Sequence, residues 1–189
     1  MKERIPDDFY DRIEPRLYRM IGRELQLAYR VLDVGCGDCE LCNFLVQTYS
    51  QQVTGVDVSS EKLPRHGRKK EGSVGRNPRC IKADAKSMDF LSDGSIDAVV
   101  MMWSLHEVRA PVTVLREARR VLRPGGGILI VDFPRRSLAA RLWDERYYTC
   151  RETTGMMKRA GFEKVKCKLL EHRQVMLATG FHLQRRRKA

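Results

Sequence analysis

The stretch that decides the fold is VLDVGCGDCELC, residues Val31 to Cys42. Its first part, Val31 to Val34, is apolar and predicts a short buried strand, and apolar residues recur at helical spacing from Leu41 onward. Gly35 and Gly37 lie between these two segments, so the pattern is strand, glycine turn and helix. At such a turn a ligand can approach the backbone closely, and the first N–H groups of the helix face it.

Strands and helices continue to alternate after this stretch. Apolar runs predict strands at 53–58, 80–83, 96–102 and 128–132. A helix is expected from Pro111 to Leu122, and two final strands, 164–170 and 175–181, form a hairpin. We therefore expect an α/β fold. It has a Rossmann-like, seven-stranded, mostly parallel sheet, helices on both faces, and one antiparallel strand from the C-terminal hairpin.

The chain has 189 residues, 42% of them hydrophobic, which is enough for one core and too short for two ordinary domains. We expect a single domain, 1–189. Residues 1–30 would form one or two amphipathic helices and 31–133 the core. Residues 134–183 would form a short helix, a second helix and the hairpin, and 184–189 a basic tail.

Apolar runs such as Gly126 to Val131 are interrupted by charge long before the roughly 20 residues that a membrane-spanning helix needs, so no membrane insertion is expected. The N-terminus is charged from Met1 to Arg4 and acidic at Asp7 and Asp8, where a secretory signal would be apolar. The expected location is the cytoplasm.

Six cysteines are present, and in an intracellular chain we expect them to be free thiols. Cys36, Cys39 and Cys42 have a CxxCxxC spacing that is typical of iron–sulfur ligation. Such clusters use a fourth nearby cysteine, which this run lacks. The alternative is that small residues suit a tight turn and a helix face. We therefore predict no metal.

The formal net charge is +12, concentrated in four segments: Lys62 to Lys70, Arg116 to Arg123, Arg135 to Arg141 and Arg185 to Lys188. Attraction to a polyanion such as RNA is one interpretation. The other is a solvated surface, since the arginines from 116 to 123 recur at helical spacing.

Two acidic residues end successive strands near the glycine turn. Asp57 follows Gly37 by twenty residues, where a carboxylate can bind both hydroxyls of a ribose. Asp84, followed by Ala85, can read the amino edge of adenine. Each aspartate alone could instead cap a helix or a turn. Glu40 stands where a GxGxxG dinucleotide motif needs its third glycine, so NAD is disfavoured.

Four stretches in order carry a family resemblance: VLDVGCGDCELC (31–42), VTGVDVS (53–59), IKADAKSMDFLSDGSIDAVVMMWSLHEV (81–108) and LREARRVLRPGGGILIVDF (115–133). Together they resemble the motifs of class I S-adenosylmethionine-dependent methyltransferases. The similarity is greatest to the subgroup, methyltransferase type 11, that includes ubiquinone- and menaquinone-biosynthesis enzymes. The terminal hairpin is similar to that family's last two strands.

The resemblance implies S-adenosylmethionine as cofactor and a binding set across the strand ends. The expected cofactor-binding residues are Asp33, Gly35, Cys36, Gly37, Asp57, Val58, Asp84, Ala85, Met102 and Trp103. The first four would hold the methionine part, and the last two would line the cofactor and acceptor pocket. Cys39 departs from the family pattern, because it replaces the third glycine of the DxGxGxG form.

His106 and Glu107 follow the fourth predicted strand, where the acceptor should bind, and either could remove a proton from it. His106 is preferred because its ordinary pKa lies near neutrality. It could also simply cap the strand or pack beneath the loop. Two functions stay open: methyl transfer to a small molecule or a protein side chain, and a cofactor-binding protein that acts on or docks to RNA or a ribonucleoprotein.

Overall fold

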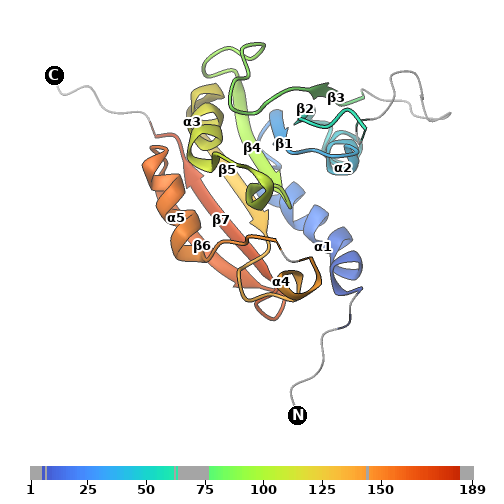
Figure 1. Ribbon diagram of the computed structural model, residues 1–189. Helices are drawn as coiled ribbons and strands as arrows, with labels where there is room; N and C mark the ends of the chain where they lie inside the picture. The colour runs from blue at the N-terminus through green and yellow to red at the C-terminus, as the bar shows by residue number, and fades with distance from the viewer. Residues whose placement is uncertain (1–5, 7, 62, 64–76, 144, 184–189) are drawn as a thin grey trace.

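The computed structural model describes residues 6, 8–61, 63, 77–143 and 145–183 (Figure 1). Its elements, in chain order, are α1 (Phe9–Glu24), β1 (Arg30–Val34), α2 (Glu40–Tyr49), β2 (Gln52–Asp57), β3 (Arg79–Lys82), β4 (Ile96–Met102), the 3-10 turn η1 (Leu105–Glu107), α3 (Pro111–Val121), β5 (Leu122–Asp132), α4 (Ala139–Leu142), α5 (Cys150–Arg159), β6 (Glu163–Leu170) and β7 (Val175–Phe181).

Seven strands form one sheet in the order β3-β2-β1-β4-β5-β7-β6. The pairs among β1 to β5 are parallel, and β7 is antiparallel to both β5 and β6. The expected fold class is therefore confirmed. The strand order reverses at β1, whose neighbours are β2 and β4, and ligands of such sheets bind at the carboxyl ends of the strands beside this reversal.

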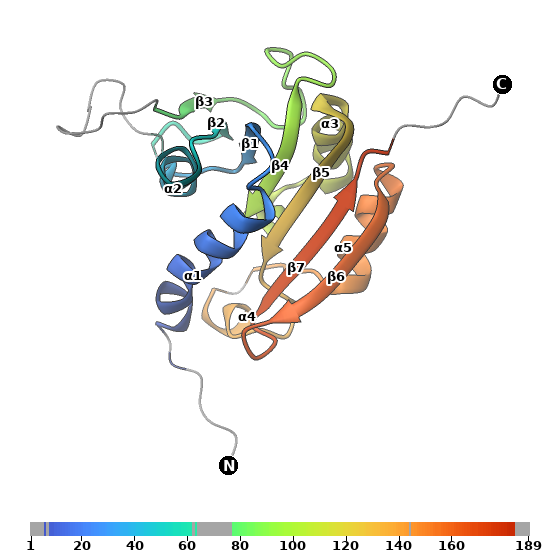
Figure 2. The same cartoon turned by 180° about the vertical axis from the view of Figure 1, so that it is seen from behind.

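Helices cover both faces of the sheet. One core lies between the sheet and α1 with α2, and it includes Val31, Val100 and Val131 from the strands. The other lies between the sheet and α3 with α5, and it includes Leu32 and Val99. Adjacent strand residues thus bury in opposite cores, as the period of two requires. Figure 1 shows α3 and α5 in front of the sheet, and Figure 2 shows α1 in front of the opposite face.

Most element bounds lie within a few residues of expectation, and β5 differs most. One helix, α1, lies in the described part of 1–30, where one or two were expected. β5 begins at Leu122 instead of Ile128, so Pro124 and the three glycines after it lie within the strand. Glycine is needed there, because a Cβ on Gly126 would lie 2.8 Å from the carbonyl oxygen of Asp97. The helix before it, α3, ends at Val121, one residue before the predicted Leu122.

The expectation of free cysteines is wrong for four of the six. Disulfides join Cys39 to Cys80 and Cys150 to Cys167, with Cα separations of 6.8 and 5.7 Å, while Cys36 and Cys42 are free. The pairs lie on different elements that the sheet brings together, within the reach of a disulfide. Their spacing in the chain, 41 and 17 residues, gives no sign of this proximity.

The basic segments are accounted for only in part. Lys62, residues 64–70 and Arg185 to Lys188 lie outside the described residues. On α3 and just after it, Arg119 donates to the carbonyl of Gly161, Arg120 binds Glu117 and Asp93, and Arg123 binds Asp97. These three arginines therefore hold the fold together as well as carrying charge. Within the described ranges no helix has both the length and the apolarity that crossing a bilayer requires.

Candidate active site

The glycine turn after β1 is held against the end of β2. The N–H groups of Gly35 and Cys36 both donate to the carbonyl oxygen of Val56, at 2.8 and 3.1 Å. Gly35 has φ +76°, and a Cβ there would lie 2.3 Å from the Cβ of Ser104. Ser104 in turn donates its hydroxyl to the carbonyl of Val34 at 2.7 Å. Only glycine fits at position 35, since both the backbone conformation and the close approach of the loop after β4 require it.

Gly37 faces open space, in contrast to Gly35. Its φ is +52°, and nothing lies within 4 Å of the position that a Cβ would take. Its N–H donates to Oδ2 of Asp57 at 3.0 Å, which fixes the turn against the end of β2. Cys39, where the family pattern has a glycine, also adopts a left-handed backbone, with φ +67°. The structure thus explains why glycine is usual there, and shows that this chain places a side chain in spite of the strain.

Asp33 is the most unusual charged group of the site. It is 2% exposed, its Oδ2 accepts a hydrogen bond from the Cys42 thiol at 3.3 Å, and its Oδ1 has no partner among the described residues. Burial, aided by the charge of Asp57 and opposed by the bond from Cys42, raises the pKa of Asp33 to about 7. A buried acceptor without a donor is costly, so a donor from a ligand would be favoured here.

The two strand-end aspartates are used differently. Asp57 is half-buried, and besides Gly37 its carboxylate accepts from the N–H of Ser59 at 2.8 Å. Asp84 is exposed and bonds to the N–H and the ammonium of Lys86, which lower its pKa. Val58, after Asp57, is 67% exposed, an apolar surface beside the turn that a flat ring could cover. Ala85, next to Asp84, is half-buried.

Met102 and Trp103 end β4 beside the turn. Met102 is buried, and Trp103 takes a left-handed backbone with φ +54°. The indole stacks on Phe133, with ring centroids 4.0 Å apart and planes 2° apart. Glu14 on α1 lies beside the indole, so the N-terminal helix reaches the site. Burial raises the pKa of Glu14, and the indole of Trp103 opposes this shift.

His106 is held by two carboxylates. Its Nδ1 lies 2.6 Å from Oδ1 of Asp132, the last residue of β5, and its Nε2 lies 3.0 Å from Oε2 of Glu145. The His106 side chain is 4% exposed. Burial alone would lower the pKa of His106, but the hydrogen bond and charge of Asp132, with Glu107 and Glu145, outweigh it and raise the pKa. Glu107 itself is exposed on η1.

Aromatic rings surround His106. Its ring centroid lies 4.8 Å from that of Tyr147 and 5.6 Å from that of Phe133. The aromatic cluster comprises Tyr10, Trp103, Phe133, Trp143 and Tyr147. Its members come from α1, from the ends of β4 and β5, and from the segment after α4. The segment between α4 and α5 therefore reaches the site through Trp143 and Tyr147.

Sequence reasoning missed three charged residues of this site. Asp132 carried a signal, because it ends a predicted strand inside the quoted stretch 115–133. No sequence pattern pointed to Glu14 or Glu145. The packing of α1 places Glu14 at the site, and the irregular segment after α4 places Glu145 there. Open surface depressions lined by Arg119 with Phe162, and by Arg120 with His182, share no residue with the site.

Comparison with known proteins identifies the family. Residues 32–130, just over half of the chain, match the family model described as "Methyltransferase domain" (Methyltransf_11). The chain belongs to this methyltransferase family. The expectation of a class I methyltransferase, a family whose methyl donor is S-adenosylmethionine, is confirmed.

Two curated relatives of this chain illustrate the match. The 27-O-demethylrifamycin SV methyltransferase of Amycolatopsis mediterranei (strain S699) is 33% identical over 123 residues, which cover 65% of this chain and 44% of that protein. The ubiquinone/menaquinone biosynthesis C-methyltransferase UbiE of Azotobacter vinelandii (strain DJ / ATCC BAA-1303) is 31% identical over 121 residues, 61% of this chain and 47% of that protein. The chain thus spans about half the length of these relatives.

A solved structure supports the fold over nearly the whole chain. The complex between the Haloferax volcanii Trm112 methyltransferase activator and a methyltransferase aligns with a TM-score of 0.74, covering 96% of each chain. The sequences are 15% identical, so this likeness shows the fold alone.

Proposed function

We propose that this methyltransferase transfers a methyl group from S-adenosylmethionine to a small, largely apolar molecule, and that His106 removes the acceptor's proton. One observation carries the proposal: a buried Asp132–His106 pair lies within an aromatic cluster at the carboxyl edge of the sheet. This arrangement joins a base that is oriented by a carboxylate to a surface that suits apolar ligands.

The cosubstrate would be held by the glycine turn. S-adenosylmethionine supplies a methyl group already activated by a sulfonium charge. The free Oδ1 of Asp33 suits its amino group, and open space at Gly37 lets its methionine part approach the backbone. Asp57 and Val58 would take the ribose, and Asp84 with Ala85 the adenine. Met102 and Trp103 would separate cosubstrate from acceptor.

Acidic side chains favour a cationic ligand near the turn. Burial, with the charges of Asp38 and Glu40, raises the pKa of Glu14. Burial and the charges of all three carboxylates raise the pKa of Tyr18. Their negative potential stabilises both the sulfonium and the ammonium of S-adenosylmethionine. After methyl transfer the sulfur is a neutral thioether and only the ammonium is left, so the product is stabilised less. This difference would assist product release.

His106 would act through Nε2. Asp132 accepts from Nδ1 and fixes the ring orientation, and Nε2 is the nitrogen left for the acceptor. In the structure Nε2 contacts Glu145, whose side chain is 47% exposed and so can move aside at little cost. We assign the base to His106 rather than to Glu107, which is exposed on η1 and contacts no ring of the aromatic cluster that the structure records.

The acceptor class rests on the aromatic cluster and on the names of the relatives. The surface formed by Trp103, Phe133 and Trp143 suits a planar or apolar molecule with an ionisable hydroxyl or carbon acid. The two relatives named above act on a rifamycin and in quinone biosynthesis, both small molecules. The RNA alternative draws on the net charge of +12 alone.

The experiment is methyl transfer from labelled S-adenosylmethionine to a fractionated cell extract. We expect label in an organic-solvent extract, dependent on His106, and a His106→Ala protein that still binds S-adenosylmethionine serves as the matched control. Label that appears only in RNA or ribonucleoprotein would replace the small molecule by the alternative acceptor. Label in none of the small-molecule, protein and RNA fractions would contradict methyl transfer.

We also propose that the protein works in the cytoplasm. Thiols are kept reduced in that compartment, so the disulfides Cys39–Cys80 and Cys150–Cys167 that the structure contains would have to open there. Cell fractionation tests the location, and the protein should be recovered together with cytoplasmic markers. Recovery with the markers of an oxidising compartment would contradict this proposal.

A further inference from the structure

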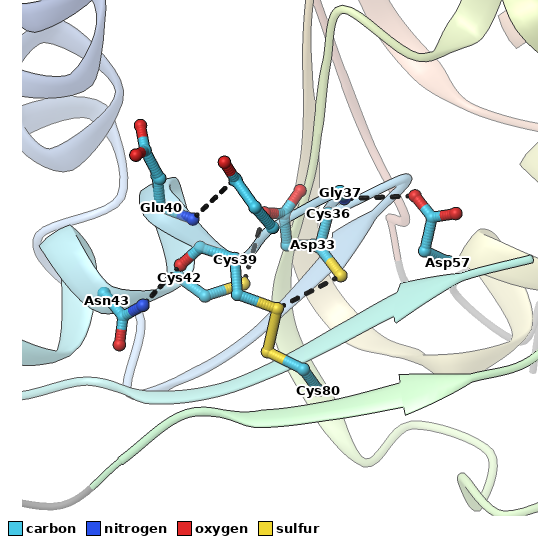
Figure 3. Close-up of a disulfide and its surroundings, with 10 residues drawn as sticks. Asp33, Cys36, Gly37, Cys39, Glu40, Cys42, Asn43, Asp57 and Cys80 are labelled. Carbon is cyan, nitrogen blue, oxygen red and sulfur yellow. Dashed lines mark hydrogen bonds between the residues drawn. A yellow bond between two sulfur atoms is a disulfide. The ribbon is translucent and has the colours of Figure 1, made fainter. Parts of the chain in front are cut away.

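The fourth cysteine that the CxxCxxC run lacks in sequence is supplied by the fold. Cys80, on β3, joins Cys36, Cys39 and Cys42, and the four sulfur atoms lie within 4.8 Å of one another. Cys39 is bonded to Cys80, and its sulfur lies 3.5 Å from that of Cys36. Figure 3 shows the sulfur atoms gathered between the glycine turn with the start of α2 and the strand β3.

The surrounding residues make room for these sulfurs. A Cβ on Gly55 of β2 would lie 2.7 Å from the sulfur of Cys36 and 2.9 Å from that of Cys42. Glycine at 55 therefore lets the thiols pack directly over the strand. Cys39 accepts a left-handed backbone at a position where glycine is usual, and so gains the side chain that the cluster needs. Cys36, Cys39 and Cys42 are buried.

We propose that, in the reduced protein, Cys36, Cys39, Cys42 and Cys80 form a tetrathiolate site for one zinc ion. Zinc binds cysteine sulfur at about 2.3 Å in a tetrahedron, which places ligand sulfurs about 3.8 Å apart. The four sulfurs, within 4.8 Å of one another, need only small shifts to reach that spacing. In a four-iron cluster each thiolate binds a different iron, so its sulfurs lie farther apart. Soft thiolate ligands also select zinc over calcium or magnesium.

The chemistry balances with a thiol or phosphine as reductant. With a thiol as reductant, two thiols give two electrons and two protons to the Cys39–Cys80 disulfide and become a disulfide themselves. With a phosphine, the phosphine gives the two electrons, and water supplies the two protons and the oxygen of the phosphine oxide. The ion then displaces one proton from each of the four thiols, and four zinc–sulfur bonds form. The hydrogen bond from the Cys42 thiol to Asp33 is lost in this step.

The site would tie the glycine turn to β3. Three of its ligands lie in the turn or the first turn of α2, and the fourth lies four residues before Asp84. The ion would thus fix the two sides of the cosubstrate site in place of the disulfide. This inference stands apart from the proposed function, because metal binding is measured without any methyl transfer.

The test is titration of the reduced full-length protein with Co²⁺ under anaerobic conditions, followed by metal analysis after exchange to Zn²⁺. We expect one ion per chain, with the visible bands of tetrahedral cobalt and near-ultraviolet charge-transfer absorption at the intensity of four thiolates. Stable zinc retention through gel filtration should follow. An iron–sulfide chromophore on the purified protein, or no tetrahedral cobalt spectrum, would overturn the proposal.

Matched variants locate the site. Cys80→Ser should lower bound cobalt from one per chain to below about a tenth, with helix content unchanged by circular dichroism. The double variant Cys150→Ser/Cys167→Ser removes the other cysteine pair and should bind cobalt like the parent. Equal binding by Cys80→Ser would contradict the site. If Cys80→Ser fails to fold, the spectrum of the parent protein still decides between four thiolates and fewer.

Discussion

Nδ1 of His106 lies 2.6 Å from Oδ1 of Asp132, and the backbone N–H of His106 donates to the other carboxylate oxygen at 3.0 Å. Two bonds from one residue to one carboxylate fix both the ring and the backbone of His106. Because the carboxylate is 1% exposed, its charge acts on the ring with little screening by water. The pair therefore sets both the orientation and the pKa of the candidate base.

Asp132→Asn should lower methyl transfer by about 10² to 10⁴-fold, because the ring loses the partner that orients it as a base. It should also lower the pKa of His106, since the negative charge that favours the protonated ring is gone. The neutral ring of His106 is the active form of the base, so the rate of methyl transfer should rise as pH passes the pKa of His106. In Asp132→Asn this rise should occur at lower pH. A pH–rate profile checks both effects. Glu107→Gln is the control and should change the rate less than about threefold if its exposed carboxylate has no role.

Glu145→Gln should raise the rate of methyl transfer at low pH, whereas Asp132→Asn should lower the rate. Removing this carboxylate also lowers the pKa of His106, but it leaves the Asp132 bond intact and frees Nε2. The rate below neutrality should therefore rise relative to the parent, by several-fold. The measurement is kcat/KM from pH 5.5 to 8.5, in ordinary buffers spanning the histidine range. A loss of activity at every pH would indicate that Glu145 contributes to binding the acceptor.

The two glycines of the turn should respond differently to alanine. Gly35→Ala adds a Cβ that overlaps Ser104 and strains a left-handed backbone, so it should lower the free energy of unfolding by about 2–4 kcal/mol. Gly37→Ala should lower the free energy of unfolding by only about 1–2 kcal/mol, the cost of placing alanine in a left-handed backbone, because no neighbour lies near its Cβ. Its effect should instead appear in cosubstrate affinity. Urea unfolding and calorimetry on both variants separate these outcomes.

Much of the fold could be predicted because its cause is local. Apolar runs predicted the first five strands, since strands buried on both faces need them, and alternation predicted the two strands of the hairpin. Ile96–Met102 and Val175–Phe181 have the predicted bounds. β5 was predicted too short, because Pro124 and glycines usually end elements. In this protein Pro124 and the glycines lie inside β5. Glycine at 126 lets the backbone of β5 pass close to the carbonyl oxygen of Asp97 on β4, and no pattern in the sequence reveals this contact.

The candidate site was predictable where residues lie at strand ends and not where packing brings them together. Asp57 and His106 were chosen because they follow predicted strands, and Asp33 because of the family resemblance; the roles of all three stay predictions. Cys80 was not associated with the CxxCxxC run, because β3 pairs with β2 across a chain separation of 41 residues from Cys39. Glu145 contacts His106 from an irregular segment, and irregular backbone has no periodic sequence pattern from which its path could be predicted.

Asp57→Ala should weaken cosubstrate binding by on the order of 1.5–3 kcal/mol, because a ribose loses a charge-assisted partner. Asp84→Ala is the comparison, and its smaller expected effect follows from its exposure and its bonds to Lys86. Asp57 also accepts from the N–H of Gly37, so folding of the variant must be checked by circular dichroism. Binding within twofold of the parent, in a folded Asp57→Ala protein, would remove Asp57 from the site.

Calorimetric titration with S-adenosylmethionine, S-adenosylhomocysteine and NAD tests the central claim most directly. The free acceptor oxygen of Asp33 and the open space at Gly37 suit a ligand with an amino group, and Glu40 stands where a dinucleotide's third glycine would be. We predict that both sulfur compounds bind with one site per chain and that NAD gives no binding heat. Tight binding of NAD, with no binding of the other two, would contradict the account.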